Sequence, residues 1–405
     1  MSLRLQKTSG QNAGVRYFDH NATHPVSSAA RGAWLEAVER FPANPSSPHR
    51  WGSRAANALE EARAALAAGL GCEAHDVVWT SGATESNNAV LHHLGLRTGG
   101  RVLLSPLEHP SMREAAGRWL TGRCREIPVS RDGVVDVGWV ESQVRAGGVA
   151  AVVVMAANNE TGVIQPWETL RDLCRGAGVA YVCDAAQWVG KLPAAGLGSC
   201  DFATGCAHKF GGIPGVGFLK APGGFLPLLV GGPQEEGRRA GTENVFGVWA
   251  MAAAYRDRET FGGLGTKPGS QGETASFPET ARRAIRDRFV DALKASLPGV
   301  AIVGERSERL WNTVSALMPP SVDCRRRWVV KLDRLGFAVS TGSACASGKE
   351  QPSHVLAAMG YRPDESDRML RFSSGWETTE ADWEALLGGI RQAAEALRTG
   401  IPIPR

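Results

Sequence analysis

The stretch that decides the fold spans residues 150–187 and is "AAVVVMAANNETGVIQPWETLRDLCRGAGVAYVCDAAQ". Its two apolar runs, at 150–157 and 180–186, predict strands, and the segment between them at 166–177 predicts a helix. Apolar runs without polar alternation are typical of strands that are buried on both faces of a parallel sheet. The stretch therefore predicts a strand–helix–strand unit of an α/β domain.

The same alternation continues toward the N-terminus. Runs at 76–81 and 101–106 predict two further strands, and 85–95 and 111–122 predict helices. In parallel α/β sheets, ligands bind beyond the carboxyl ends of the strands. Small or polar residues stand at three of these ends, namely Ser81-Gly82-Ala83-Thr84, Asn158-Asn159-Glu160 and Asp184-Ala185-Ala186-Gln187. A ligand site is therefore expected along this edge of the sheet.

The bulk composition limits the possible classes of protein. A chain of 405 residues is long enough for two hydrophobic cores, and 43% hydrophobic content is ordinary for a globular protein. The net charge of +4 gives no reason to expect a nucleic-acid partner. The longest apolar stretch, at 147–157, is too short to cross a bilayer, and the N-terminus lacks the apolar core of a signal peptide. We therefore expect a cytoplasmic protein that binds no membrane.

The segment 261–280 divides the chain. It is rich in glycine, serine, threonine and proline, which is typical of a loop or an interdomain connection. Beyond it, 279–297 predicts an arginine-rich helix, and the remainder alternates short strands with helices. We therefore predict a large domain at 16–262 and a smaller α+β domain formed by 263–405 together with 1–15.

Lys209 is the most informative lysine of the chain. It lies in "DFATGCAHKFGGIPGVGFL" (201–219), after a strand-like run and before a glycine- and proline-rich turn. A surface lysine is the ordinary alternative, but the adjacent His208 and a turn that lets the backbone approach a ligand favour a cleft. A lysine desolvated in a cleft can lose its proton and form a Schiff base, which is what pyridoxal phosphate (PLP) chemistry needs.

Upstream segments contain the other parts of such a site. "TSGATESNN" (80–88) follows a strand and opens a helix, so its backbone N–H groups and the Thr84 hydroxyl suit a phosphate, although such residues also serve as simple N-caps. Asp184 ends a buried strand, where a carboxylate is either a satisfied cap or the partner of a pyridinium nitrogen. Gln187 stands three residues later and could reach the phenolic oxygen of the ring.

These blocks together resemble the class V aminotransferase-type PLP enzymes and, more narrowly, the cysteine desulfurases that feed iron–sulfur cluster assembly. The similarity runs from "YFDHNAT" (17–23) to "LRFSSGWETTEADWEAL" (370–386). The blocks between are "NPSSPHRWG", "SGATESNN", "EHPS", "NNETGVIQP", "CDAAQWVGKLP", "AHKFGG", "RAGTENV" and "STGSACASG". The resemblance implies the PLP-dependent transferase fold type I, with a mostly parallel seven-stranded sheet covered by helices in the large domain.

The resemblance also implies a role for each cofactor-binding residue. Lys209 would hold PLP covalently, Asp184 would pair with the pyridine nitrogen, and Gln187 would bond the phenolic oxygen. His109, in "EHPS", would stack on the ring and assist proton transfer. The phosphate would be held by Ala83, Thr84, Cys206 and His208, with Thr242 of "RAGTENV" reaching the phosphate of the other subunit. Such shared sites imply a homodimer.

Cys345 lies in "STGSACASGKEQPSH" (340–354), whose small residues are typical of a mobile loop. None of the eight cysteines forms a Cys-x-x-Cys pair, so no metal site is expected. The resemblance implies that Asn159 and Arg371 hold the carboxylate of L-cysteine while Cys345 attacks its sulfur. L-Alanine would leave, and a persulfide on Cys345 would pass to a sulfur-acceptor protein.

Several positions depart from the family pattern. Cys206 replaces a serine, and a thiol is a weaker hydrogen-bond donor than a hydroxyl. His24 replaces a threonine, Glu236 replaces an arginine, and the basic region 320–334 matches poorly. The alternative interpretation is therefore another class V enzyme, an aminotransferase or lyase for a different amino acid, in which Cys345 is not catalytic. The third interpretation is a non-catalytic scaffold of the same fold. The nearly complete set of PLP residues argues against this interpretation.

Overall fold

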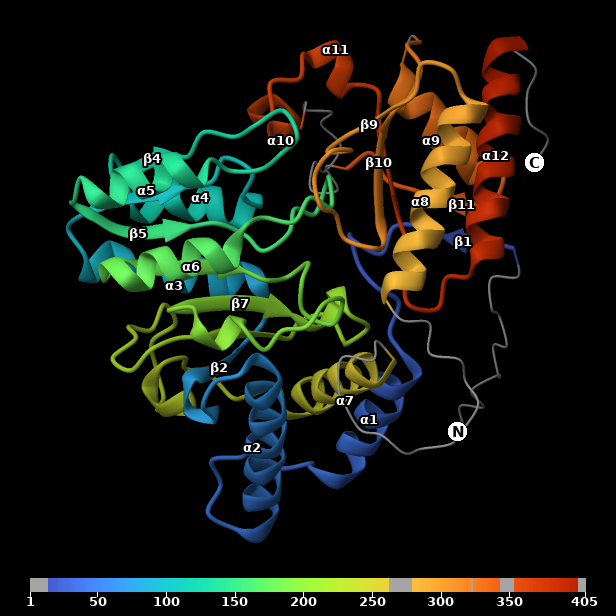
Figure 1. Cartoon of the computed structure of the whole chain (residues 1–405). Helices are drawn as coiled ribbons and strands as arrows, with labels where there is room; N and C mark the ends of the chain where they lie inside the picture. The colour runs from blue at the N-terminus through green and yellow to red at the C-terminus, as the bar shows by residue number, and fades with distance from the viewer. Residues whose placement is uncertain (1–13, 262–278, 322, 343–352, 400–405) are drawn as a thin grey trace, which may run out of the picture.

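The structure is a computed structural model that describes residues 14–261, 279–321, 323–342 and 353–399 (Figure 1). Cys345 and residues 262–278 of the predicted connection lie outside the described residues. The domain boundary expected near residue 262 therefore stays a prediction.

A seven-stranded sheet forms the centre of the larger part of the molecule. Its strands stand in the order β2-β8-β7-β6-β5-β3-β4, and only β8 runs antiparallel to its neighbours. They are β2 (Val77–Thr80), β3 (Arg101–Leu104), β4 (Cys124–Glu126), β5 (Val149–Val153), β6 (Ala180–Asp184), β7 (Phe202–Cys206) and β8 (Gly217–Lys220). The predicted mostly parallel, seven-stranded sheet is confirmed.

Helices cover both faces of this sheet (Figure 1). They are α1 (Ser28–Arg40), α2 (Arg50–Leu70), α3 (Ala83–Arg97), α4 (Pro110–Trp119), α5 (Val137–Arg145), α6 (Trp167–Ala177) and α7 (Val245–Phe261). Helices α3 and α4 pack on one face, and the other five pack on the opposite face. Alternate residues of one strand serve the two cores, since Val152 joins the first cluster and Val153 the second. This double burial explains why the strands are apolar throughout.

Short 3₁₀ turns complete the larger part of the molecule. They are η1 (Ala74–Asp76), η2 (Leu197–Ser199), η3 (Ala207–Lys209) and η4 (Gln234–Gly237).

In the described part of the chain, no helix is long and apolar enough to cross a membrane.

The smaller part has an antiparallel sheet, β12-β10-β9, with helices packed against it. Its elements are α8 (Glu279–Ser296), β9 (Ala301–Ile302), β10 (Thr313–Leu317), α9 (Cys324–Arg334), β11 (Phe337–Ala338), α10 (His354–Ala358), α11 (Pro363–Ser366), β12 (Met369–Ser373) and α12 (Glu380–Thr399). The arginine-rich helix predicted at 279–297 is confirmed as α8.

The N-terminal segment ties the two parts together. Strand β1 (Arg16–Tyr17) pairs in parallel with β11, and Phe18 packs edge-on against Trp383 of α12 at 4.9 Å. From there the chain runs past the edge of the large sheet and enters α1 (Figure 1). Residues 19–24 therefore lie between the two parts of the molecule, where the cavity described next is found.

Candidate active site

One cavity of about 760 Å³ opens between the carboxyl edge of the large sheet and the smaller part. It is bordered by most of the predicted site residues, which are Ala83, Thr84, His109, Asn159, Asp184, Gln187, Cys206, His208, Lys209 and Arg371. Thr242 does not border it, and Cys345 lies outside the described residues. The structure thus brings together residues that are up to 288 positions apart in the sequence, from Ala83 to Arg371.

Lys209 stands at the end of β7, in the turn η3. Its Nζ donates to the backbone oxygens of Asn21 and Ala22 at 2.7 and 2.8 Å. Both acceptors belong to the segment that links the two parts of the molecule. The N-terminal segment therefore fixes the amine at the wall of the cavity.

Asp184 stands at the carboxyl end of β6 and is 5% exposed. Its Oδ2 accepts from the Asn87 side chain at 2.8 Å, and its Oδ1 accepts from the Ala186 N–H at 2.9 Å. Thr204 in turn donates to Asn87 at 2.6 Å, which fixes the orientation of that amide. A carboxylate has more lone pairs than these two donors use, so it can still receive a pyridinium N–H.

The start of α3 supplies the expected anion site. Its N-cap, Gly82, has a φ of +153°, and a Cβ at Gly217 would come within 2.5 Å of the Gly82 Cα. Only glycines permit this close approach of two backbones. The first turn of a 15-residue helix then presents backbone N–H groups beside Thr84, as a phosphate requires. These donors, with Asp184, Gln187 and Lys209, fit PLP.

His109 caps α4 and borders the cavity. Its Nδ1 accepts the backbone N–H of Ser111 at 3.1 Å, so the neutral ring carries its proton on Nε2. Burial lowers the pKa of His109, although the nearby Asp184 opposes this shift. Near neutral pH the ring is therefore uncharged, and its Nε2–H can donate a hydrogen bond into the cavity.

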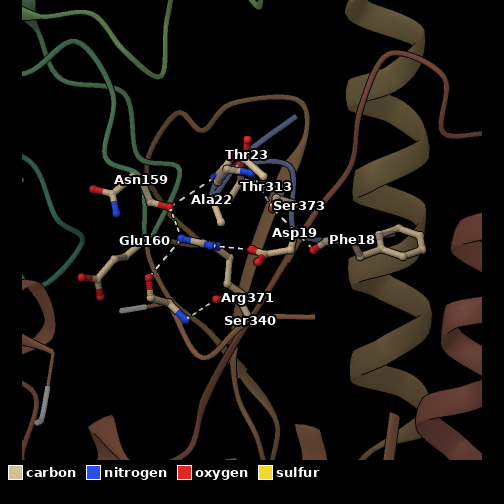
Figure 2. Close-up of polar contacts among 12 residues, drawn as sticks. Phe18, Asp19, Ala22, Thr23, Asn159, Glu160, Thr313, Ser340, Arg371 and Ser373 are labelled. Carbon is tan, nitrogen blue, oxygen red and sulfur yellow. Dashed lines mark hydrogen bonds and ion pairs between the residues drawn. The ribbon is translucent and has the colours of Figure 1, made fainter. Parts of the chain in front are cut away.

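Arg371 lies on β12 and is 1% exposed. One terminal nitrogen donates to Asp19 at 2.7 Å, and the other donates to the backbone oxygens of Asn159 and Gly342 at 2.8 and 3.1 Å (Figure 2). Its buried Nε has no hydrogen-bond partner among the described residues. The guanidinium thus sits at the cavity with donor capacity that suits a carboxylate. Figure 2 shows the side-chain amide of Asn159 pointing away from it, so the contact in this structure uses the Asn159 backbone.

Cys206 is buried at the end of β7 and receives the backbone N–H of Ala83. Burial raises the pKa of its thiol to about 11, although the charge on Lys209 opposes the shift. The thiol therefore stays protonated near neutral pH and does not serve as a nucleophile. Its contact with Ala83 places it beside the start of α3, where the phosphate is expected.

Replacing Cys206 with serine is expected to tighten PLP binding about tenfold, because a hydroxyl donates a stronger hydrogen bond to a phosphate. Equilibrium dialysis of the apoprotein with PLP measures this change. Cys124→Ser, at an exposed thiol, serves as the control and should leave the affinity unchanged. An unchanged or weaker affinity of Cys206→Ser would show that the thiol makes no contact with the cofactor.

Two other departures from the family pattern have clear contacts. Glu236 is exposed and pairs with Arg238 at 3.2 Å, so it lies outside the cavity wall. His24 lies 3.2 Å from Glu377, which also receives Arg258 at 2.8 Å. Burial opposes the ionisation of Glu377, but His24 and Arg258 together lower its pKa. His24 therefore belongs to an ionic cluster that joins α7 to the segment after β12.

The family model described as aminotransferase class-V matches residues 16–386. The chain belongs to this family. Its members depend on PLP, and the cavity described above holds the matching donors.

Relatives in this family carry a narrower name. The chain is 33% identical to cysteine desulfurase 2 of Trichormus variabilis, over 96% of this chain and 95% of the relative. It is 32% identical to cysteine desulfurase IscS of Dictyoglomus turgidum, over 95% and 96% of the two chains. A NifS-like protein of known structure superposes with a TM-score of 0.82 at 29% identity, covering 94% of this chain and 99% of that one. The NifS-like protein of Rickettsia africae superposes with a TM-score of 0.81 at 27% identity, with the same coverage.

Sequence reasoning missed two residues of the site. Asn21 accepts from Lys209 and Gln187 through its backbone oxygen, and its side chain contacts both parts of the molecule. Lys191 is 3% exposed and contacts Gln187. A lysine four positions after Gln187, in the otherwise apolar "WVGKLP", was the available signal for the second residue.

Proposed function

We propose that this protein is a PLP-dependent cysteine desulfurase, which converts L-cysteine to L-alanine and leaves the sulfur as a persulfide on Cys345. The observation that supports it most is the convergence of Lys209, Asp184 and Arg371 on one cavity. The names of the relatives support the choice of substrate. The alternative, a different class V activity with Cys345 incidental, rested partly on Cys206 and Glu236, and neither side chain blocks the cavity.

PLP, when bound, supplies an electron sink for bonds at the substrate Cα. The residues of the chain do the rest. Arg371 binds the substrate carboxylate and is held in place by Asp19 at 2.7 Å. The Lys209 amine moves the proton at Cα, and His109 donates a hydrogen bond from its Nε2 toward the reacting groups. Cys345 receives the sulfur, and an acceptor protein takes it onward.

The test is release of alanine from L-cysteine by the PLP-loaded protein, measured together with sulfide in the presence of a thiol reductant. Wild type is expected to form both products. Cys345→Ala is expected to form them at least about 100-fold more slowly, since it lacks the nucleophile. Equal alanine release by the variant would refute the role of Cys345. Turnover that requires a 2-oxo acid, with none of L-cysteine, would select the alternative activity.

We also propose that the protein acts as a cytoplasmic homodimer with shared sites. Thr242, the residue assigned to the phosphate of the other subunit, does not border the cavity of its own chain. Apolar side chains are exposed on α1 and in the segment before Thr242, namely Trp34, Leu35, Val38, Leu229 and Val230. Their burial between two chains would account for this exposure. Sedimentation equilibrium of the purified protein tests the dimer, and a monomer at micromolar concentration would refute it.

A further inference from the structure

A buried lysine lies behind Gln187. Lys191 is 3% exposed, and its Nζ donates to the Gln187 side-chain oxygen and to the Asn21 Oδ1 at 3.0 Å. No carboxylate pairs with Lys191 in the part of the chain that the structure describes. A buried amine without a counter-ion is costly, so its retention here requires another explanation.

The neighbours of Gln187 fix the orientation of its amide. The backbone oxygen of Asn21 can only accept, so the Gln187 atom 3.0 Å from it is the Nε2 nitrogen. The oxygen of the amide therefore faces Lys191. The side chain of Asn21 is fixed in the same way, because its Nδ2 donates to the backbone oxygen of Asn159 at 3.2 Å. Gln187 is thus held at both ends, by Asn21 and by Lys191.

Among the described residues, this arrangement gives only one of the two Gln187 side-chain N–H groups an acceptor. The Nε2 nitrogen has two hydrogens, and the Asn21 oxygen takes one of them. Gln187 borders the cavity, so the second hydrogen can meet an acceptor there. Burial, followed by the charge on Lys209, lowers the pKa of Lys191 well below its usual range. An uncharged amine still donates hydrogen bonds, so Lys191 can hold the Gln187 oxygen in either protonation state.

We propose that Lys191 is a positioning residue that holds the Gln187 oxygen and thereby keeps the second Nε2–H of Gln187 on the phenolic oxygen of PLP. The inference rests on the proposed PLP site. Without Lys191, the Gln187 oxygen would have lost its donor and the amide could rotate. The phenolic oxygen would then lose a hydrogen bond that stabilises its negative charge.

Lys191→Met, which keeps the length of the side chain and removes the donor, tests this proposal in the holoprotein. The dissociation constant of PLP is expected to rise about tenfold, as loss of one hydrogen bond to a charged group predicts. The visible absorption of the bound PLP changes with pH, and the midpoint of this change is expected to rise by about 0.5–1 pH unit. The reason is that a phenolic oxygen without its hydrogen-bond donor holds the neighbouring proton more strongly. Lys191→Gln retains a donor and should recover part of both changes.

Lys220→Met is the matched control. Lys220 is also buried, at 8% exposure, and its Nζ donates to the backbone oxygen of Cys200 at 2.9 Å. Unlike Gln187, to which Lys191 donates, Lys220 and Cys200 do not border the cavity. This variant should keep the wild-type affinity and midpoint. A wild-type PLP affinity and a wild-type midpoint in Lys191→Met would overturn the proposal. If Lys191→Met does not fold, Lys191→Ala replaces it, and wild-type values in Lys191→Ala would overturn the proposal. Equal values in Lys191→Gln and Lys191→Ala would also overturn it. If wild type binds PLP and releases alanine, such a result refutes only the role of Lys191. Failure of wild type to bind PLP refutes the proposed function itself.

Discussion

Lys209→Ala is expected to release alanine from L-cysteine at least about 10⁴-fold more slowly than wild type, which is the upper range for loss of one acid–base group. The physical reason is that Lys209 supplies the only lysine amine that borders the cavity in the described part of the chain. Its Nζ is already fixed by two backbone oxygens of the N-terminal segment. A replacement amine from elsewhere on the protein would therefore need a rearrangement of this wall. Alanine formation over several hours, with PLP in excess, measures the residual rate.

The control for this variant is Lys294→Ala, at an exposed lysine of α8 that pairs with Glu305. It should retain full activity, and both variants should keep the circular dichroism spectrum of wild type. Activity of Lys209→Ala within tenfold of wild type would remove Lys209 from the chemistry. It would also undermine the proposed PLP reaction at this cavity.

Glu235→Ala is expected to lower the free energy of unfolding by about 3 kcal/mol, the lower end of the usual cost of removing one partner of a buried ion pair. Glu235 accepts both terminal nitrogens of Arg63 at 2.8 Å, and it also accepts the Trp79 N–H at 2.8 Å. The side chains of the pair are 8% and 1% exposed. Removing the carboxylate leaves the Trp79 N–H without its acceptor. It also leaves the buried guanidinium of Arg63 with only the exposed Glu60 carboxylate and the Val77 backbone oxygen as acceptors among the described residues. Urea denaturation measures the loss.

Glu236→Ala is an unusually close control for this prediction. Glu235 and Glu236 are adjacent and share a left-handed backbone, with φ of 50° and 56°, so both variants change backbone strain alike. Glu236 is exposed and pairs only at the surface with Arg238, so its loss should change the unfolding free energy by less than about 0.5 kcal/mol. The double variant Arg63→Met/Glu235→Ala should be more stable than the sum of its two single losses predicts, because it removes both partners of the buried pair. Equal stability of the two alanine variants would contradict the importance of the buried pair.

The sequence predicted the fold well because burial on both faces leaves a simple pattern. Strand β5 has no polar residue in its five positions, and alternate residues enter different cores. The same rule fails for β4, whose residues Cys124–Glu126 are exposed at the edge of the sheet. An edge strand that lacks a buried face has no comparable pattern, so it was not predicted.

The site was predicted where a residue type is chemically distinctive. Lys209 and Asp184 stand at strand ends, and parallel topology brings such ends together. Asn21 could not be predicted from local composition, because its role depends on contacts with Gln187, Asn312 and Thr313 across the fold. Glu235 shows the same limit. The sequence drew attention to the neighbouring Glu236, and only tertiary packing distinguishes the buried carboxylate from the exposed one.

The path of the N-terminal segment has a consequence for protein synthesis. Asn21 is made early, yet its side chain contacts Asn312 and Thr313, and its backbone N–H donates to Ser373. Strand β1 likewise waits for β11. At about 5–20 residues per second, a ribosome needs tens of seconds to produce these partners. The contacts that join Asn21 to the smaller part of the molecule can therefore form only after most of the chain has been translated.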